Sequence, residues 1–341
     1  MAQHKLQISE LDFDKIKSNL KTFLQSQTQF QDYDFDGSGL SILLDVLSYN
    51  THYLSYIANM STNELYLDSA DIRNNIVSLA KMLGYTPSSP RAPRASIDIK
   101  LNNAIGSSVT MVKGTVFSTT VNSVEYQYVT NEDITISPVD GIYEFKNATI
   151  YEGTLVTFKY VYDINDPDQK LVIPTNTADT STLKIIVQNS STDTTQSVYA
   201  LAGGYNSVSS DSKVYFIQET IDGKFQIYFG DGVLGKAIAD GNIVILDYIT
   251  CNLDEPNGAT TFTLSGTVGG FSNVTITTIG NAAGGAAPET IKSIKYNAPR
   301  DYTSQDRAVT ADDYKVLVKS LYANAQSVQV YGGEDAATPD Y

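Results

Sequence analysis

The stretch LSILLDVLSYNTHYLSYIANM, Leu40–Met60, decides how the first part of this 341-residue chain folds. Large apolar side chains recur in it every three or four residues, which is the spacing of one face of an α-helix. As one continuous helix, residues 39–60 would be roughly 33 Å long at 1.5 Å per residue. Such a helix needs protein on its apolar face, because burying a large aliphatic side chain stabilises a fold by roughly 1.5–3 kcal/mol.

Two seven-residue series run along this helix, offset by three positions like the a and d positions of a coiled coil. An asparagine within that seam would fix the register and the choice of partner helix. The pattern alone leaves two coverings equally open: other helices of the same chain, or another subunit. We predict a partner-helix interface made of six side chains: Leu40, Leu43, Leu47, Asn50, Leu54 and Ile57.

Two shorter helices are predicted, one on each side of the long helix. Ser9 and Asp12 have the spacing of a capping box, and apolar side chains then recur at helical spacing over about residues 10–25. A third helix is predicted over about residues 70–83. Gly84 follows it as a left-handed terminator.

Residues 1–86 are therefore predicted to form a helical arm, and three closely spaced prolines come next. Each proline fixes its own φ and disfavours the helical conformation of the residue before it. Residues 87–94 accordingly predict a semi-rigid, proline-rich linker between the arm and the next domain.

At Ala95 the apolar period shortens to two residues, which is typical of strands. Short runs rich in Thr, Val, Tyr and Ile, separated by Gly, Asn and Asp, continue to about residue 280. Residues 95–280 are therefore predicted to form one largely antiparallel β domain, a sandwich or a barrel.

The last segment, residues 281–341, combines several local predictions. The glycine-rich GNAAGGAAPET, residues 280–290, is expected to be a flexible connector. A helix is predicted over residues 311–321, capped by Thr310 and Asp313, and QSVQVYGG predicts a strand after it. The predicted fold class is thus α+β and multidomain, with an N-terminal helical bundle arm, a central antiparallel β domain and a C-terminal α/β segment.

Composition limits the classes of partner and compartment. Acidic residues outnumber basic ones by 38 to 23, and a net charge of -15 repels phosphate backbones, so we expect no nucleic-acid partner. Cys251 is the single cysteine, which excludes a disulfide within the chain and predicts a small buried side chain. We expect no signal peptide and no membrane span, since no apolar run approaches the roughly 20 residues that a span needs.

Three aspartates alternate in residues 32–36 and are followed by Gly37, which is how an EF-hand calcium loop begins. That loop closes with a bidentate glutamate at its twelfth position, and here the twelfth position is Leu43. We therefore favour a helix start over a metal site, with Asp36 or Ser38 as the cap. A calcium-dependent enzyme or adhesin is the alternative that these aspartates leave open.

No catalytic or cofactor site is predicted from the remaining motifs. Histidines are limited to His4 and His52, too few for a histidine-rich zinc site, and no phosphate-binding glycine loop is present. Asp231, between two glycines in FGDG, is expected to form a turn. We therefore predict no enzyme activity, no metal and no cofactor.

Three stretches carry a resemblance to a known family. YDFDGSGLSILLDVLSYNTHYLSYIANMSTNELYLDSADIRNNIVSLAKMLGYTPSS, residues 33–89, resembles the N-terminal region of the large baseplate wedge subunit of T-even-like contractile-tailed phages. QIYFGDGVLG and NAPRDYTSQDRAVTADDYKVLV are similar to the wider baseplate J-like family. The first match is long and specific, whereas the glycine-rich match alone would be weak.

The resemblance implies a structural protein with no catalytic residue. In that family, two copies of the subunit associate with a smaller wedge protein through a helical core bundle, and six wedges form a ring around the central hub. Leu40–Met60 would then lie in the bundle, and the segment after Asn297 would be the J-like portion. Family members continue beyond the position of Tyr341 into a region that pairs neighbouring subunits.

Partners and location follow from the same resemblance. The implied partners are a second copy of the chain, the smaller baseplate wedge protein, the sheath-initiating baseplate protein, and other wedge and hub proteins. The implied location is the tail baseplate of the virion, assembled in the bacterial host cytoplasm. The rival function is a receptor- or glycan-binding tail protein that acts through its tyrosine-rich β domain, since the chain has 23 tyrosines.

Overall fold

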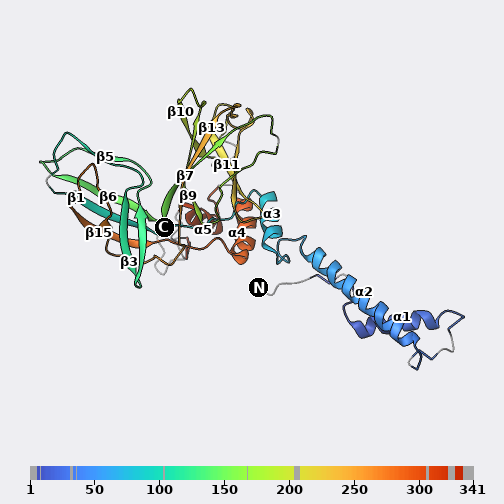
Figure 1. Ribbon diagram of the computed structural model, residues 1–341. Helices are drawn as coiled ribbons and strands as arrows, with labels where there is room; N and C mark the ends of the chain where they lie inside the picture. Colours follow the sequence, from blue (N-terminus) through green and yellow to red (C-terminus); the bar gives the residue numbers. More distant parts are fainter. Residues whose placement is uncertain are drawn as a thin grey trace.

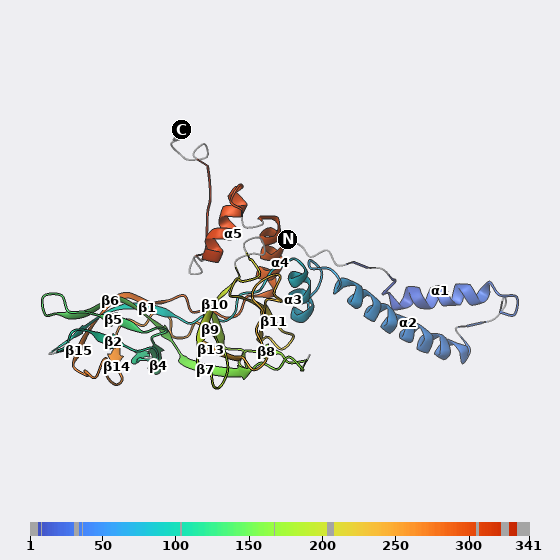
Figure 2. The ribbon, with the colours of Figure 1, turned by 90° about the horizontal axis from the view of Figure 1, so that it is seen from above.

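Figure 1 shows an α+β protein in which a helical arm projects from a body of β-strands. The arm consists of α1 (Phe13–Gln25) and α2 (Leu40–Asn63), and Figure 2 shows from a second side that it lies beyond the strands. The predicted α+β class with its N-terminal helices is confirmed. The computed structural model describes residues 6–7, 9–30, 34–35, 37–102, 104–166, 168–202, 208–304, 307–321 and 327–332.

α1 begins later than predicted because Asp12, rather than Ser9, caps it. The Asp12 carboxylate accepts a hydrogen bond from the Lys15 backbone N–H at 3.1 Å, which satisfies one free donor of the first turn. Ser9 has another role, since its Oγ accepts a hydrogen bond from the side-chain amide of Asn59 at 2.7 Å. The capping-box prediction is therefore wrong at Ser9.

α2 is 24 residues long and ends three residues later than predicted. Its N-cap is Gly39, which has no side chain to offer, so the prediction of Ser38 as the cap is wrong. Ser38 Oγ donates instead to the carbonyl oxygen of Phe35 at 3.5 Å. The other predicted cap, Asp36, lies outside the described residues.

Where the arm meets the body, α3 (Arg73–Met82) packs against α4 (Ile291–Ser304). α3 ends as predicted: Gly84 has a φ of +81°, and the Tyr85 N–H reaches back to the carbonyl of Ala80. α4 was not predicted, because it contains Pro299 and follows a glycine-rich stretch. The buried side chains that α3, α4 and the turn before α3 share are Ala70, Ile76, Val77, Ala80, Ile294 and Ala298.

The first sheet has six strands in the order β14-β3-β4-β6-β1-β15. A two-stranded sheet, β2 (Val109–Met111) with β5 (Ile134–Ile136), contributes to the same hydrophobic core. All the pairings in these two sheets are antiparallel. The six strands are β1 (Arg94–Leu101), β3 (Val116–Val121), β4 (Val124–Val129), β6 (Tyr143–Glu152), β14 (Thr263–Leu264) and β15 (Val274–Ala283).

The second sheet has seven strands in the order β7-β13-β9-β10-β11-β12-β8 and a separate core. Strands from both ends of this order enclose one core, and Tyr160 Oη donates to the carbonyl of Val172 at 2.5 Å, so the sheet curls until its edges meet. Its pairings are antiparallel except β10 with β11. The strands are β7 (Thr154–Val161), β8 (Leu171–Val172), β9 (Ala178–Gln188), β10 (Gln196–Leu201), β11 (Val214–Glu219), β12 (Phe225–Phe229) and β13 (Ile243–Thr250).

The region predicted as one β domain, residues 95–280, thus contains two large sheets, each with its own core, and a two-stranded sheet that shares the first core. The chain builds β1 to β6, completes the second sheet from β7 to β13, and returns to the first with β14 and β15. Periodicity finds the strands but does not say which of them share a core, because that depends on pairings far apart in sequence. The domain boundaries stay predictions.

Direct polar contacts join the two sheets. The Lys113 ammonium lies 2.5 Å from the Asp247 carboxylate of β13, and Asp247 is 4% exposed. Glu152, at the end of β6, accepts hydrogen bonds from the Asn252 backbone N–H at 2.9 Å and its side-chain amide at 2.7 Å. Burial raises the pKa of Glu152 despite these hydrogen bonds.

Two carboxylates attach the root of the arm to the body. Glu219 of β11 accepts a bidentate pair of hydrogen bonds from Arg73 of α3, both at 3.0 Å. Glu289, just before α4, accepts hydrogen bonds from the Tyr85 hydroxyl at 2.8 Å and the Ser88 N–H at 3.1 Å. The side chains of Ser293 and Asn297 in α4 also donate to Glu289.

Both segments expected to be connectors are packed into the body. In the proline-rich residues 87–94, the Ala92 N–H donates to the buried Asp179 carboxylate at 2.9 Å. In the glycine-rich residues 280–290, the first four complete β15, and Ala286 pairs with Arg91. The expectation of a flexible connector is therefore wrong, because glycine here permits close packing: a Cβ on Gly285 would lie 2.3 Å from the Leu253 carbonyl oxygen.

The predicted C-terminal helix is confirmed as α5 (Ala311–Leu321). Its cap is the expected reciprocal pair: the Asp313 N–H donates to Thr310 Oγ1 at 3.2 Å, and the Thr310 N–H donates to the Asp313 carboxylate at 2.8 Å. The strand predicted in QSVQVYGG is not found in its described part, residues 327–332.

At the junction between the two large sheets, adding one methyl group to the backbone is expected to lower the stability of the fold strongly. Gly153 has a φ of +115°, and a Cβ there would lie 1.9 Å from the Thr250 carbonyl oxygen. We expect Gly153→Ala to lower the free energy of unfolding by about 3 kcal/mol or more, because backbone strain and a steric clash add. Urea denaturation of the purified chain measures this loss.

The matched control is Gly141→Ala. Gly141 also has a positive φ, +74°, but a Cβ there would meet nothing within 4 Å. Only the conformational cost of about 1 kcal/mol is expected. Equal losses in the two variants would contradict the tight approach of β6 to the end of β13.

Candidate partner-binding face of the helical arm

α2 has three faces of different character, about 110° apart around the helix axis. One face is covered by α1 and by the strap, which we define as the described residues between Leu6 and Asp12. The second carries the six residues of the predicted interface and is called the Leu seam. The third, the Tyr stripe, consists of Ile42, Val46, Tyr49, Tyr53, Tyr56 and Met60.

The covered face of α2 is mainly polar. Asn63 and Leu6 form two hydrogen bonds: the Asn63 side-chain amide donates to the Leu6 carbonyl at 2.8 Å, and the Leu6 N–H donates to Asn63 Oδ1 at 2.9 Å. His52 Nδ1 donates to the Leu11 carbonyl at 2.9 Å. The four buried residues of α2 are Leu44, Ser48, Asn59 and Asn63.

These hydrogen bonds give the strap a defined register on α2. Asn59 donates to Ser9 Oγ, between the contacts of Asn63 and His52, and the Lys17 ammonium of α1 lies 2.5 Å from the Asp45 carboxylate. Directional hydrogen bonds are lost when the partners shift by one residue, whereas apolar contacts tolerate such a shift. The chain therefore uses polar groups for its internal contact on this helix.

The Leu seam is uncovered in the single chain. Leu43, Leu47, Leu54 and Ile57 are 42–58% exposed, Asn50 is exposed, and Leu40 is half-buried. α1 covers a different face, and α3 lies beyond the C-terminal end of α2 (Figure 1). The seam therefore has room for a further helix along its length.

The Tyr stripe is uncovered as well. Its six side chains are 47–68% exposed, although each is large and apolar or aromatic. A soluble helix normally confines its apolar residues to one stripe, and a helix that is apolar around most of its circumference is normally buried among other helices. No helix among the described residues is long and apolar enough to cross a membrane.

The other residues that the sequence analysis considered either make structural contacts or lie outside the described residues. Among the described residues, no group of three or more His, Cys, Asp or Glu side chains could hold a metal. Asp34 accepts a hydrogen bond from the Gly37 N–H at 3.2 Å, as in a turn, and Asp32 and Asp36 lie outside the described residues. His52 is occupied by the strap.

Asp231 and Cys251 have the structural roles that the sequence predicted. The Asp231 carboxylate accepts hydrogen bonds from the Val233 and Leu234 N–H groups at 2.9 Å each, which form the turn and lower the pKa of Asp231. Cys251 is buried just after β13, and burial raises the pKa of its thiol to about 11. A thiol with a raised pKa is a poor nucleophile.

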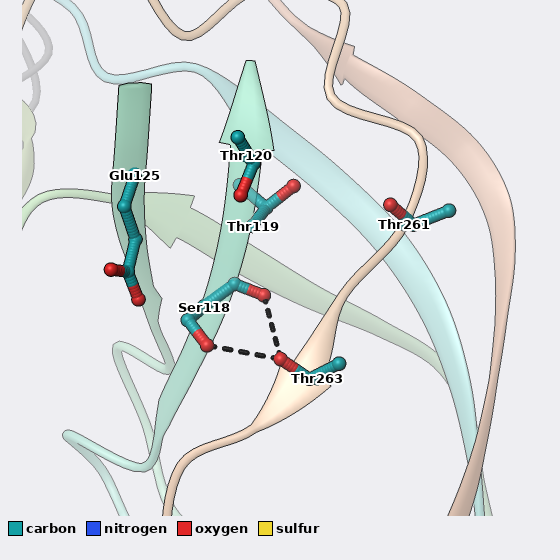
Figure 3. A pocket seen from close by; sticks show the side chains of 6 residues that line it. All are labelled: Ser118, Thr119, Thr120, Glu125, Thr261 and Thr263. Carbon is teal, nitrogen blue, oxygen red and sulfur yellow. Dashed lines mark hydrogen bonds between the residues drawn. The ribbon is translucent and has the colours of Figure 1, made fainter. Parts of the chain in front are cut away.

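A depression of about 370 Å³ lies on the first sheet beside β14 and β3, and Figure 3 shows the side chains that line it. It is lined by five hydroxyl side chains and one carboxylate, without an aromatic residue: Ser118, Thr119, Thr120, Glu125, Thr261 and Thr263. Several tyrosines of the two β cores are buried: Tyr128, Tyr143, Tyr199, Tyr215 and Tyr248. The tyrosine-based glycan site of the rival function therefore gains no support from this depression.

The sequence analysis missed the Tyr stripe and the polar strap. Tyr49, Tyr53 and Tyr56 have the helical spacing that would have revealed the stripe, but a template of leucine heptads passes over them. The strap contacts join residues about 40 to 57 positions apart, so no local pattern could have shown them.

The strap contacts predict a local change in stability. Asn59→Ala removes the hydrogen bonds to Ser9 Oγ and to the Ser55 carbonyl at 2.9 Å. We expect faster amide hydrogen exchange in the strap and α1 by about fivefold to tenfold, since a lost hydrogen bond costs about 1 kcal/mol. Leu54→Ala, on the Leu seam, should leave exchange in the strap unchanged. Unchanged exchange in Asn59→Ala would show that this hydrogen bond does not hold the strap.

Three family models match successive parts of the chain. They are the helical domain of baseplate wedge protein gp6-like proteins at residues 12–85, the third domain of bacteriophage baseplate wedge protein gp6 at residues 154–253, and C-terminal domain I of baseplate structural protein gp6 at residues 310–341. The first match covers the arm and the second covers the strands of the second sheet.

Two known proteins are similar over most of the chain. The baseplate wedge protein gp6 of Enterobacteria phage T4 is 29% identical over 96% of this chain, which spans about half, 52%, of that relative. A cryo-EM structure of the anti-feeding prophage (AFP) baseplate, 6-fold symmetrised, covers 93% of this chain and 66% of the chain compared, with 13% identity and a TM-score of 0.34. A likeness that low carries no argument about function. The three gp6 domain matches in sequence order, together with the T4 relative, show that this chain is similar to gp6-like phage baseplate wedge proteins.

Proposed function

We propose that this chain is a structural component of the baseplate of a contractile phage tail. In this proposal α2 joins a helical bundle, the wedge core, with a second copy of the chain and a smaller wedge protein. The body then contributes to the ring of wedges around the hub. The similarity to gp6-like baseplate wedge proteins supports the baseplate role, and the uncovered apolar faces of α2 support the bundle.

The Leu seam is the observation that carries this proposal. Four of its large aliphatic side chains are about half exposed or more, and they lie on an arm that extends away from the body (Figure 1). Isolated soluble chains rarely leave such a row uncovered, because each side chain gains roughly 1.5–3 kcal/mol when it is buried. A partner helix that covers the seam would recover this free energy.

Two coverings of the seam were open from the pattern, and the folded chain supports the second. α1 packs on the polar face of α2, and α3 packs against α4 at the root. These helices are thus engaged elsewhere. The exposed Asn50 within the seam suits a role in register, since a polar residue there needs a hydrogen-bonding partner from the other helix.

The remaining partners are proposed from the resemblance to baseplate wedge proteins alone. They are the sheath-initiating baseplate protein and other wedge and hub proteins, with the virion tail baseplate as the location and the host cytoplasm as the place of assembly. The role is non-enzymatic in this proposal. The J-like assignment of the segment after Asn297 is retained as part of the proposal, with α5 as its first described helix.

Introducing negatively charged side chains into the Leu seam tests the proposal. Replacing both Leu47 and Leu54 by aspartate should abolish co-purification of the chain with the co-expressed wedge proteins of its phage. Burying two unpaired carboxylates in an apolar seam costs several kcal/mol, which exceeds what a small helical contact supplies. Pull-down through a tag on the smaller wedge protein measures the complex.

The matched control places the same charges on another exposed apolar pair. Val198→Asp with Leu201→Asp changes two side chains of β10 that are 69% and 55% exposed, so the exposure is similar but the site is on the second sheet. This variant should co-purify normally, and thermal unfolding should show that both variants remain folded. Undiminished complex formation by the Leu47 and Leu54 variant would contradict the proposed bundle contact.

A further inference from the structure

The depression on the first sheet contains a buried polar group that the fold leaves unpaired. The hydroxyl of Thr119 has no hydrogen-bond partner among the described residues, although Thr119 is only 5% exposed. Buried polar groups in folded proteins are nearly always hydrogen-bonded, so an unpaired one needs an explanation. Figure 3 shows this hydroxyl turned toward Thr261, which lines the same depression. A ligand that enters between them would supply the missing partner.

The depression forms where one segment changes its partner strand. The Gly258 N–H donates to the Ala282 carbonyl of β15 at 2.7 Å, whereas Thr263 pairs with Ser118 of β3. Ser118 directs its carbonyl oxygen to this edge, where it accepts a hydrogen bond from Thr263 Oγ1 at 3.2 Å. Backbone direction alternates along a strand, so Thr120 directs its N–H and carbonyl to the same edge. The register of β14 ends at Ser118, and the edge at Thr120 is open to an added segment.

The lining has one charged side chain, Glu125 of β4, directly opposite Thr120 in the pairing of β3 with β4. Within the described part of the chain, the Glu125 carboxylate and the hydroxyls of Thr120 and Thr261 make no hydrogen bond or ion pair. A carboxylate without a partner attracts cations, and the net charge of -15 strengthens that attraction. The lining has neither a cation for an anionic ligand nor an aromatic ring for stacking. The ligand is therefore a cation at its Glu125 end.

We propose that this depression binds an arginine side chain on an extended segment of a partner protein. The guanidinium donates to the Glu125 carboxylate, because it carries only donors and its planar shape matches a carboxylate. The peptide groups of the segment bond to the hydroxyls of Thr119 and Thr261, since a hydroxyl both donates and accepts. The site belongs to the body of the molecule, and the inference does not depend on the Leu seam.

The extent of the depression favours a protein segment over a small free cation. Its volume of about 370 Å³ is at the lower end of the range of ligand pockets, roughly 300–1,000 Å³. Figure 3 shows Glu125 and Thr261 on opposite sides of β3, so a compact cation at Glu125 does not reach both ends. An extended segment contacts both ends, and its backbone can pair with the open edge at Thr120 as an added strand does.

Binding of a short peptide to the full chain tests the proposed ligand. The probe has five residues, with arginine at its centre and glycine on either side, and NMR of threonine methyl groups follows the titration. We expect the signals of Thr119, Thr120 and Thr261 to shift. The same peptide with citrulline, the uncharged analogue of arginine, should bind about tenfold more weakly or worse, because charge-assisted hydrogen bonds are lost. Equal binding of the two peptides, or equally tight binding of spermidine, would overturn the proposal.

A pair of variants tests the role of the carboxylate. Glu125→Gln should weaken binding of the arginine peptide by about tenfold or more. Glu132→Gln makes the same change in net charge between β4 and β5, where the Glu132 side chain is 69% exposed and lies 3.6 Å from Lys184. This control should bind the peptide normally. Equal losses in the two variants would show a general effect of charge and overturn the assignment to Glu125.

Thr119→Val separates ligand binding from folding. Valine has nearly the same shape as threonine without the hydroxyl, and the Thr119 hydroxyl has no partner to lose in the described chain. The free energy of unfolding, measured by urea denaturation, should therefore stay the same or rise. Binding of the arginine peptide should weaken by about fivefold, the effect of one lost hydrogen bond. A loss of stability, or undiminished binding, would overturn the role of Thr119.

Discussion

α2 carries more apolar surface than the rest of its own chain covers. The other features of the arm are best explained by this excess of exposed apolar surface. The polar face of the helix packs against α1 and the strap, whereas the Leu seam and the Tyr stripe are exposed to solvent. Two of its three faces would gain free energy if other helices covered them. In the proposed function the arm is a surface for assembly, and the body holds it in place.

The attachment of the arm explains how the body can fix its direction. Arg73 of α3 is held by the buried Glu219 carboxylate of the second sheet, and Glu289 connects the segment after α3 with α4. Bidentate and charge-assisted hydrogen bonds restrain orientation as well as distance. The two sheets are themselves joined through Asp247 and Glu152. Through these contacts the root of the arm is connected to both sheets, which suits the proposed structural role.

The sequence predicted the elements better than their assembly. Helix spacing located α2 and α3, Gly84 marked the end of α3, and the Thr310–Asp313 cap of α5 formed as expected, because these signals depend on neighbours in the chain. α4 was missed since Pro299 outweighed its pattern, although its packing against α3 tolerates the proline. The division of the strands into two cores could not be predicted, because β14 and β15 return to a sheet that began some 170 residues earlier.

The candidate site shows the same limit in finer detail. The seam residues were identified as a set because their spacing of seven is local. Whether they are covered depends on where α1 packs, and α1 is directed to the other face by Asn59, Asn63 and His52, whose partners lie about 40 to 57 residues away. Polar residues on a helix are usually taken to mark the face exposed to solvent. On α2 they instead form the contact with the rest of the chain.

This inversion has a physical advantage for a chain that must fold before it assembles. Hydrogen bonds between the strap and α2 are specific to their own register, so they do not attract a second helix in place of α1. The apolar faces are less selective, but a net charge of -15 keeps copies apart except where uncharged surfaces meet. Charge thus limits nonspecific association while the polar strap keeps α1 in its place, and the exposed apolar faces remain available for helices that fit them.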